Sequence, residues 1–243
     1  MVREFEERPI ENNLSSEMAT ENPELYKSLL LETLKTKSQL SYSFWQYLIK
    51  EGLANADIEL NDQNYISEST ERGITMGTLP LPENLKKVVM FEEESFGNYE
   101  TEKAYLLSHE ISHKIAALIG TSEKGERFNN LYTTVINFRK TGGKGLSGLG
   151  SLDFYKRTDK RKTAEENAQI QAETQAREDL TELLNMYLWN PDYFKRFVEF
   201  LADPKFKNIR KKLDIHSLSK EASEHVFKLI SESVEEFRKM RNI

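Results

Sequence analysis

The sequence predicts an α+β protein with a small, mostly antiparallel sheet between helical regions. Apolar residues recur at helical spacing near the start of the chain and again beyond residue 163, whereas three short runs between these regions have the composition of strands. Helices, then a small sheet, then more helices are typical of an α+β fold, because a parallel α/β fold would alternate the two kinds of element.

The first helical region covers residues 23–52 and predicts one helix or a helix pair that ends at Gly52. Residues 1–22 are rich in Glu, Asn and Ser, and we expect a polar tail there. We assign residues 23–243 to a single domain with helical extensions. The apolar positions of the first region are Leu25, Leu29, Leu30, Leu34, Phe44, Trp45, Leu48 and Ile49.

Three short segments are strand candidates: residues 57–60, 73–79 and 86–92. The second segment is bounded by Gly73 and Pro80, which punctuate a strand. The third is an apolar run that contains Val88, Val89, Met90 and Phe91. We expect these strands to form one small sheet that packs on the helix following it.

That helix is predicted over residues 98–120. Asn98 is a favourable N-cap, and Gly120 is a favourable C-cap. Glu100 and Glu102 place negative charge in the first turn, where it stabilises the helix dipole. One side of the helix carries an apolar stripe that we expect to face the core: Ala104, Leu107, Ile111, Ile115 and Leu118.

The second half of the chain predicts an insertion followed by helices. The insertion loop covers residues 121–162, with a helix over residues 128–139 and then a stretch with five glycines, residues 141–151, for which we expect a flexible loop. The helices beyond the insertion are predicted over residues 163–189, 191–202, 205–213 and 219–240.

The composition excludes several kinds of protein. The 40 acidic and 34 basic residues are largely interleaved and give a net charge of -6, so we expect no nucleic-acid partner. The chain has no cysteine, which excludes disulfides, thiolate metal ligands and a cysteine nucleophile. There is no signal-peptide pattern and no apolar run near the roughly 18 residues of a membrane span. We therefore expect a cytoplasmic protein without a membrane partner, with leaderless secretion as the alternative.

The helix over residues 98–120 carries a possible metal site. His109 and His113 are four residues apart, so both imidazoles project from one face, one turn apart, and can converge on one ion. Glu110 lies about 100° round the helix, within reach of a water held by that ion. The pattern predicts two zinc ligands and a general base in the segment His109-Glu110-Ile111-Ser112-His113.

A zinc site needs a third protein ligand, and the predicted helix over residues 163–189 offers acidic side chains. Glu178 and Glu182 lie one turn apart on a face that continues into Met186 and Trp189. A solvated charged face is the alternative for this pair. Other acidic residues of the same helix compete for the role of ligand: Glu165, Glu166, Glu173 and Asp179.

Residues 109–113 and 174–189 together resemble the two signatures of the zincin metallopeptidases, in particular the gluzincins. The resemblance implies a zincin-like fold, Glu178 as the third ligand of one Zn²⁺, and Glu182 as the residue that orients a zinc-bound histidine. The metzincin branch is disfavoured, because Ala116 and Ile119 occupy the positions where it has Gly and His.

The expected activity is that of a zinc-dependent endopeptidase, in which a zinc-held water activated by Glu110 hydrolyses a peptide or protein substrate. The alternative is an inactive or non-enzymatic helical interaction protein with a zincin-like fold. No spacing rule selects an oxyanion-stabilising residue, for which His216, His225 and Tyr155 are candidates. The sequence leaves open whether residues 1–50 are an inhibitory prosegment, and it indicates no oligomeric state.

Overall fold

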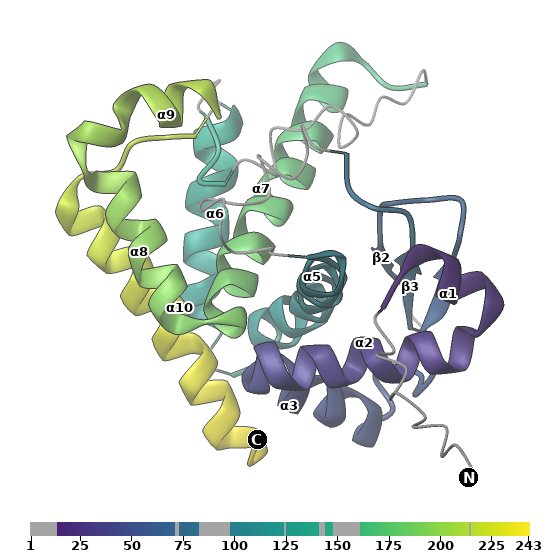
Figure 1. The fold of residues 1–243 in the computed structure, drawn as a ribbon. Helices are drawn as coiled ribbons and strands as arrows, with labels where there is room; N and C mark the ends of the chain where they lie inside the picture. The colour runs from purple at the N-terminus through teal and green to yellow at the C-terminus, as the bar shows by residue number, and fades with distance from the viewer. Residues whose placement is uncertain are drawn as a thin grey trace, which may run out of the picture.

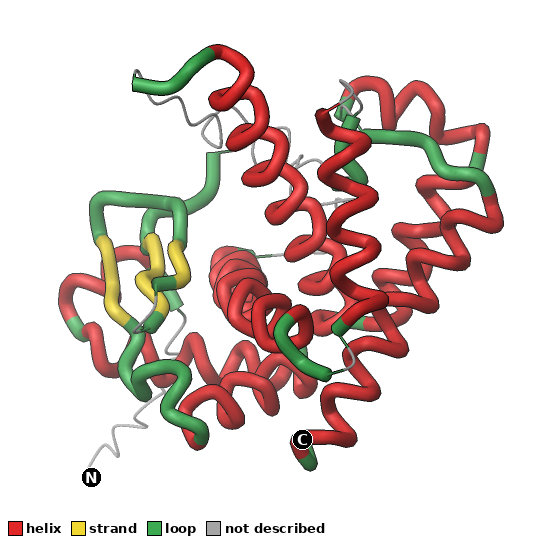
Figure 2. Tube along the Cα trace, turned by 180° about the vertical axis from the view of Figure 1, so that it is seen from behind, coloured by secondary structure: helices red, strands yellow, loops and turns green. Residues whose placement is uncertain are grey.

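The computed structural model describes residues 14–70, 73–82, 98–123, 125–140, 144–147, 161–213 and 215–243. The described chain is mostly helical, with a three-stranded sheet at one side (Figure 1). Seen from behind, the strands lie on one side of a central helix and the C-terminal helices on the other (Figure 2). The α+β class predicted from the sequence is confirmed at this level.

The first helical region is a helix pair, α2 (Pro23–Lys37) and α3 (Gln39–Lys50), and Gly52 follows it with a φ of 67°. Ser38 separates the two helices: its hydroxyl caps α3 by accepting the N–H of Ser41 and donates to the Leu188 carbonyl at 2.7 Å. One end of a helix near the start of the chain is thereby tied to a segment 150 residues away.

The prediction of a polar tail over residues 1–22 is wrong for the part that the structure describes, which begins at residue 14. Residues Ser16–Glu21 form a short helix, α1, and both Leu14 and Ala19 are buried. The helix pair also belongs to the core, because Leu30, Leu34, Phe44 and Leu48 are completely buried. Removal of residues 1–50 as a prosegment would therefore take part of the core with it.

The sheet contains β1 (Glu59–Asn61), β2 (Glu68–Ser69) and β3 (Ile74–Gly77) in the order β1-β3-β2. The segments 57–60 and 73–79 correspond to β1 and β3. The prediction missed β2, which is too short to show an alternating pattern. The sheet is mixed rather than mostly antiparallel, because β1 pairs with β3 in parallel and β2 pairs with it antiparallel. The predicted strand 86–92 lies outside the described residues.

The central helix is α5 (Tyr99–Gly120), and Asn98 caps it by accepting the N–H of Thr101 at 2.9 Å, as predicted. It contacts α2 and α3 on one side, α7 on another, and strands β2 and β3. The apolar stripe from Ala104 to Ile115 is completely buried, whereas Leu118 is half-buried and Ile119 is buried in its place. Burial of each Leu or Ile stabilises the fold by roughly 1.5–3 kcal/mol.

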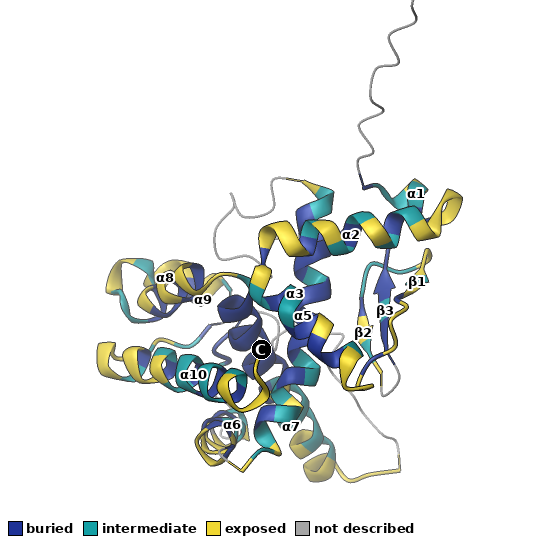
Figure 3. Cartoon of the chain, turned by 90° about the horizontal axis from the view of Figure 1, so that it is seen from below, coloured by how far each residue is buried: buried dark blue, intermediate teal, exposed yellow. Residues whose placement is uncertain are grey.

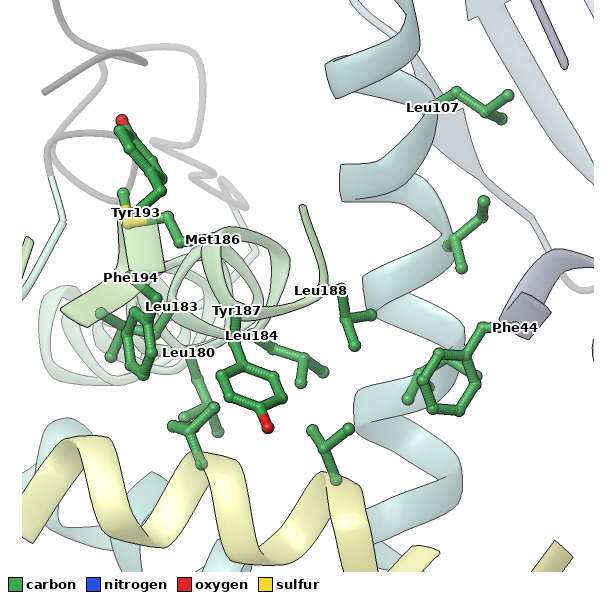
Figure 4. Packing of buried hydrophobic residues seen from close by; sticks show 14 of the residues in the cluster. Phe44, Leu107, Leu180, Leu183, Leu184, Met186, Tyr187, Leu188, Tyr193 and Phe194 are labelled. Atoms are coloured by element: carbon green, nitrogen blue, oxygen red, sulfur yellow. The ribbon is translucent and has the colours of Figure 1, made fainter. Parts of the chain in front are cut away.

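The second half of the chain forms α6 (Glu126–Lys140), α7 (Ala164–Trp189), α8 (Pro191–Ala202), the 3₁₀ turn η3 (Pro204–Phe206), α9 (Lys207–Lys212) and α10 (Lys220–Arg241). A capping box of Thr163 and Glu166 begins α7, and Asn190 ends it and caps α8. Leucines of α7 pack against Phe194 of α8 and against α10 (Figure 4). Buried residues lie toward the centre, and the outer faces of α2, α8 and α10 are exposed (Figure 3). Among the described residues, no helix is long and apolar enough to cross a membrane.

Part of the glycine-rich stretch is not the flexible loop that its composition predicts. Gly145, Leu146 and Ser147 are buried, and Gly145 bridges to Ile215. The Ser147 backbone N–H and hydroxyl both donate to Asp179 Oδ1 at 2.9 Å.

Asp179 also neutralises a cation. Its Oδ2 accepts from Arg139 Nε at 3.0 Å and from Arg139 Nη2 at 2.7 Å, and the Arg139 side chain is only 5% exposed. A side chain on α7 therefore holds both α6 and residues 145–147 in place.

The Asp179→Ala substitution is expected to lower the free energy of unfolding by about 3–5 kcal/mol, because it leaves the buried Arg139 without its counter-charge. Glu173→Ala is the matched control on the same helix: its partly exposed carboxylate lies 3.9 Å from Lys140, and its loss should cost less than about 1 kcal/mol. Urea denaturation of both variants measures the difference. Equal stability of the two would contradict a structural role for Asp179.

Candidate metal centre

The structure brings the two histidines of α5 against one carboxylate of α7. Glu178 Oε2 lies 3.5 Å from His109 Nε2 and 3.3 Å from His113 Nε2. One ligand atom from each of the three residues lies within 4.8 Å of the other two, a grouping that could hold a metal ion. The two imidazole rings are perpendicular, with centroids 4.8 Å apart.

Each histidine has an outer nitrogen, Nδ1, which is the ring nitrogen that does not face Glu178. The outer nitrogen of His109 is held by Glu182. His109 Nδ1 lies 2.8 Å from Glu182 Oε2, and since an ionised carboxylate can only accept, Nδ1 carries a proton. The neutral form of His109 therefore presents the lone pair of Nε2, the atom that can bind a metal. Glu182 is itself held by Tyr105, whose hydroxyl donates to Oε1, and by Asn185, whose amide donates to Oε2 at 3.4 Å. Tyr105 packs edge-on against Trp189.

The outer nitrogen of His113 meets a different partner. Thr181 Oγ1 lies 3.1 Å from His113 Nδ1. The sequence analysis missed Thr181 and Tyr105, although helical spacing offered a signal for both. Thr181 follows Glu178 by three residues, and Tyr105 precedes His109 by four, so each lies on the same face as a predicted ligand.

Of the acidic residues on α7, Glu178 is the one placed at both histidines. Asp179 is turned toward Arg139, and Glu173 lies near Lys140. Glu165 is exposed, and Glu166 caps the start of the helix. Of the acidic residues that the sequence offers as a third ligand, position along and around the helix therefore brings Glu178 to the two histidines.

Three carboxylates of this region are buried: Glu110, Glu178 and Glu182 are 5%, 8% and 1% exposed. No Lys or Arg forms an ion pair with any of them in the part of the chain that the structure describes. Burying carboxylates is costly without a nearby positive charge, which here can come only from the two imidazoles among the described residues or from a metal ion that they bind.

The pKa values in this group follow from burial and proximity. Burial opposes the charged form of His109, yet Glu178 and Glu182 outweigh it and raise the pKa of His109 well above its usual range. Burial raises the pKa of Glu178, but the adjacent His109 and His113 more than offset this and hold it far below its usual range. For Glu110, burial prevails over the two histidines and the Ser69 N–H, so its pKa is raised.

His216 and His225, two of the three candidate oxyanion residues, are not part of this group. His225 is exposed on α10, where it lines a cavity of about 340 Å³ together with residues of α6. The backbone N–H of His216 donates to the Gly145 carbonyl at 2.7 Å, and burial lowers the pKa of its imidazole. Tyr155 lies outside the described residues.

Loss of either a histidine or the carboxylate should remove the metal. Purified wild-type protein is expected to carry about one zinc ion per chain, and His113→Ala and Glu178→Ala should lose most of it, since two protein ligands remain. His225→Ala, at an exposed position, is the control and should retain the wild-type content. Elemental analysis after dialysis measures this, and equal zinc in wild type and His113→Ala would rule out the site.

Replacement of Glu182 tests the support of His109. Glu182→Gln keeps the shape but removes the charge that makes the imidazole a stronger ligand, so zinc affinity is expected to fall roughly 10- to 100-fold. Glu173→Gln removes a charge from the same helix away from the histidines and should leave the affinity unchanged. Competition with a chelator of known affinity measures both, and equal affinities would show that Glu182 gives no support.

Comparisons with protein-family models, with curated proteins and with solved structures found no match. The chemistry of the site therefore has to be inferred from the residues that form it. Those residues are two imidazoles and a carboxylate whose ligand atoms converge, each imidazole being held at its outer nitrogen.

Proposed function

We propose that the chain is a zinc-dependent endopeptidase whose metal is held by His109, His113 and Glu178. One observation carries the proposal: the ligand atoms converge around Glu178 Oε2, a buried oxygen that has no hydrogen-bond partner among the described residues. Buried polar atoms are nearly always satisfied, and a cation held by this carboxylate oxygen and the two imidazole nitrogens would satisfy it.

The donor set fits zinc. Two histidine nitrogens and one carboxylate oxygen are a common ligand set of catalytic zinc sites, which leave a fourth position for water or substrate. Metal-bound histidines usually have a partner at the outer nitrogen, and here Glu182 and Thr181 supply one each. The excess of buried carboxylates also favours a divalent ion over an empty site.

A bound zinc ion would polarise the scissile carbonyl and make a water molecule acidic enough to attack it. Glu110 is the residue of this chain that would move the proton. It follows His109 directly on α5, which contacts β2, and the backbone of Ser69 on β2 favours its charged form. Because burial raises its pKa, Glu110 can take the proton from water and return it to the leaving amine more readily than an ordinary surface carboxylate.

The arrangement also supports a gluzincin-like site. Glu178 at the histidines and Glu182 at His109 Nδ1 occupy the places that the resemblance implies for the third ligand and the orienting acid. We propose a zincin-like catalytic core on α5 and α7, a peptide or protein as substrate, and the cytoplasm as the place of action.

A structural metal site in a non-enzymatic protein is the second candidate. The observation in its favour is the burial of His109, Glu110 and Glu178, since a structural ion is enclosed while a catalytic ion needs an open position. His113, whose side chain is 19% exposed, is the most accessible of the three proposed ligands. Activity measurements distinguish the two candidates.

Glu110→Gln separates chemistry from metal binding. The amide keeps the size of the side chain but cannot accept the proton of a water molecule, so hydrolysis of a peptide library should fall by at least ~100-fold. Zinc content and thermal stability should stay near wild type. Glu173→Gln, which removes a partly exposed carboxylate from α7, should keep full activity.

Chelation should abolish the wild-type activity, and added zinc should restore it. The full chain is the right material, because α2 and α3 belong to the core. If the protein bound zinc but cleaved nothing across broad libraries, the peptidase proposal would fail and the structural role would replace it.

A further inference from the structure

The two histidines have chemically unlike partners at their outer nitrogens. His109 faces the carboxylate of Glu182, which only accepts hydrogen bonds, so the Nδ1 atom of His109 must carry a proton. His113 faces the hydroxyl of Thr181, which can either donate or accept. Thr181 by itself therefore does not fix which nitrogen of neutral His113 carries the proton, and the other nitrogen, Nε2, lies 3.3 Å from Glu178 Oε2.

Thr181 departs from the usual behaviour of threonine inside a helix. Helical threonines commonly donate to the carbonyl four residues earlier. Thr33, Thr36, Thr133 and Thr134 all do so in this protein, at 2.8 to 2.9 Å. Within the described chain, the hydroxyl of Thr181 instead has His113 as its hydrogen-bond partner.

Thr181 lies in a part of α7 where most neighbouring residues are apolar. The residue is 1% exposed on α7, and its neighbours Leu180, Leu183 and Leu184 belong to the apolar core. A buried hydroxyl in such a place costs free energy unless it is hydrogen-bonded, and a valine would fill the same volume without that cost. Among the described residues, the hydrogen bond to His113 is the interaction that accounts for a threonine here.

We propose that Thr181 is the positioning residue of His113, holding the ring so that Nδ1–H donates to Oγ1 and Nε2 faces the metal. The inference rests on the proposed zinc site and deepens it. For Nε2 to bind a metal, the proton of neutral His113 has to be on Nδ1, and a hydrogen-bond acceptor at Nδ1 favours that tautomer. Thr181 Oγ1, 3.1 Å away, is that acceptor.

Three variants test the inference. Thr181→Val removes the acceptor with little change in shape and should weaken Zn²⁺ binding roughly 10- to 100-fold. Thr181→Ser restores a hydroxyl at the same place and should recover most of the affinity. Thr133→Val, at an exposed helical position, is the matched control and should bind as wild type does. Competition between the protein and a chelator for Zn²⁺ measures all four affinities.

Nuclear magnetic resonance of histidine-labelled protein supplies a readout that a packing defect alone would not change. The chain has only 4 histidines, so their ring nitrogens can be assigned by substitution. In the zinc-loaded wild type and in Thr181→Ser, His113 should show a protonated Nδ1 whose hydrogen exchanges slowly with water. In Thr181→Val, that signal should exchange faster or be lost, while the Nδ1–H of His109 stays as in wild type.

The outcomes separate this inference from the proposed function. If Thr181→Val bound Zn²⁺ as tightly as wild type and kept the same His113 signal, the inference would be overturned while the zinc site stood. If Thr181→Ser failed to recover what Thr181→Val lost, the hydroxyl would not be the cause and the inference would likewise fall. If the wild type bound no Zn²⁺, the proposed function would fail and the inference with it.

Discussion

The packing of α5 against α7 is the contact on which the rest of the candidate site depends. Apolar side chains such as Ile111 and Leu184 are completely buried, so the hydrophobic effect holds the helices together before any polar contact is counted. That rigid pairing places Glu178 between two histidines and Glu182 behind one of them. Polar groups that would be costly to bury alone are thus held in positions where they can act together.

The consecutive residues Glu178 and Asp179 show how the same helix serves two purposes. About 100° of rotation separates them, so one faces the histidines of α5 and the other faces Arg139 of α6. Asp179 has a guanidinium as counter-charge, and Glu178 has no Lys or Arg among the described residues. The contrast indicates that a guanidinium balances the charge of Asp179, whereas Glu178 faces only the two imidazoles with which it forms the candidate metal site.

The contacts of Asp179 also explain why residues 145–147 are buried, although the composition of the insertion predicts a flexible loop. A glycine-rich segment is expected to be flexible when no packing contact or hydrogen bond fixes its backbone. At Gly145, however, the absence of a side chain allows the backbone to approach Arg139 and Asp179 so closely that a Cβ would collide with both. The glycine therefore serves close packing here, and Ser147 completes the attachment by donating twice to Asp179.

Local patterns in the sequence determined the helices and the two histidines, because caps, apolar spacing and the four-residue interval between His109 and His113 act within a few turns of one helix. They also named Glu178 and Glu182 through a resemblance, but could not choose between Glu178 and Asp179. Only the tertiary structure decided that choice, because it depends on which helix packs on which face of α7. It also revealed β2, the burial of Leu14 and the hydrogen bonds of Tyr105 and Thr181, since each of these arises from partners distant in the chain.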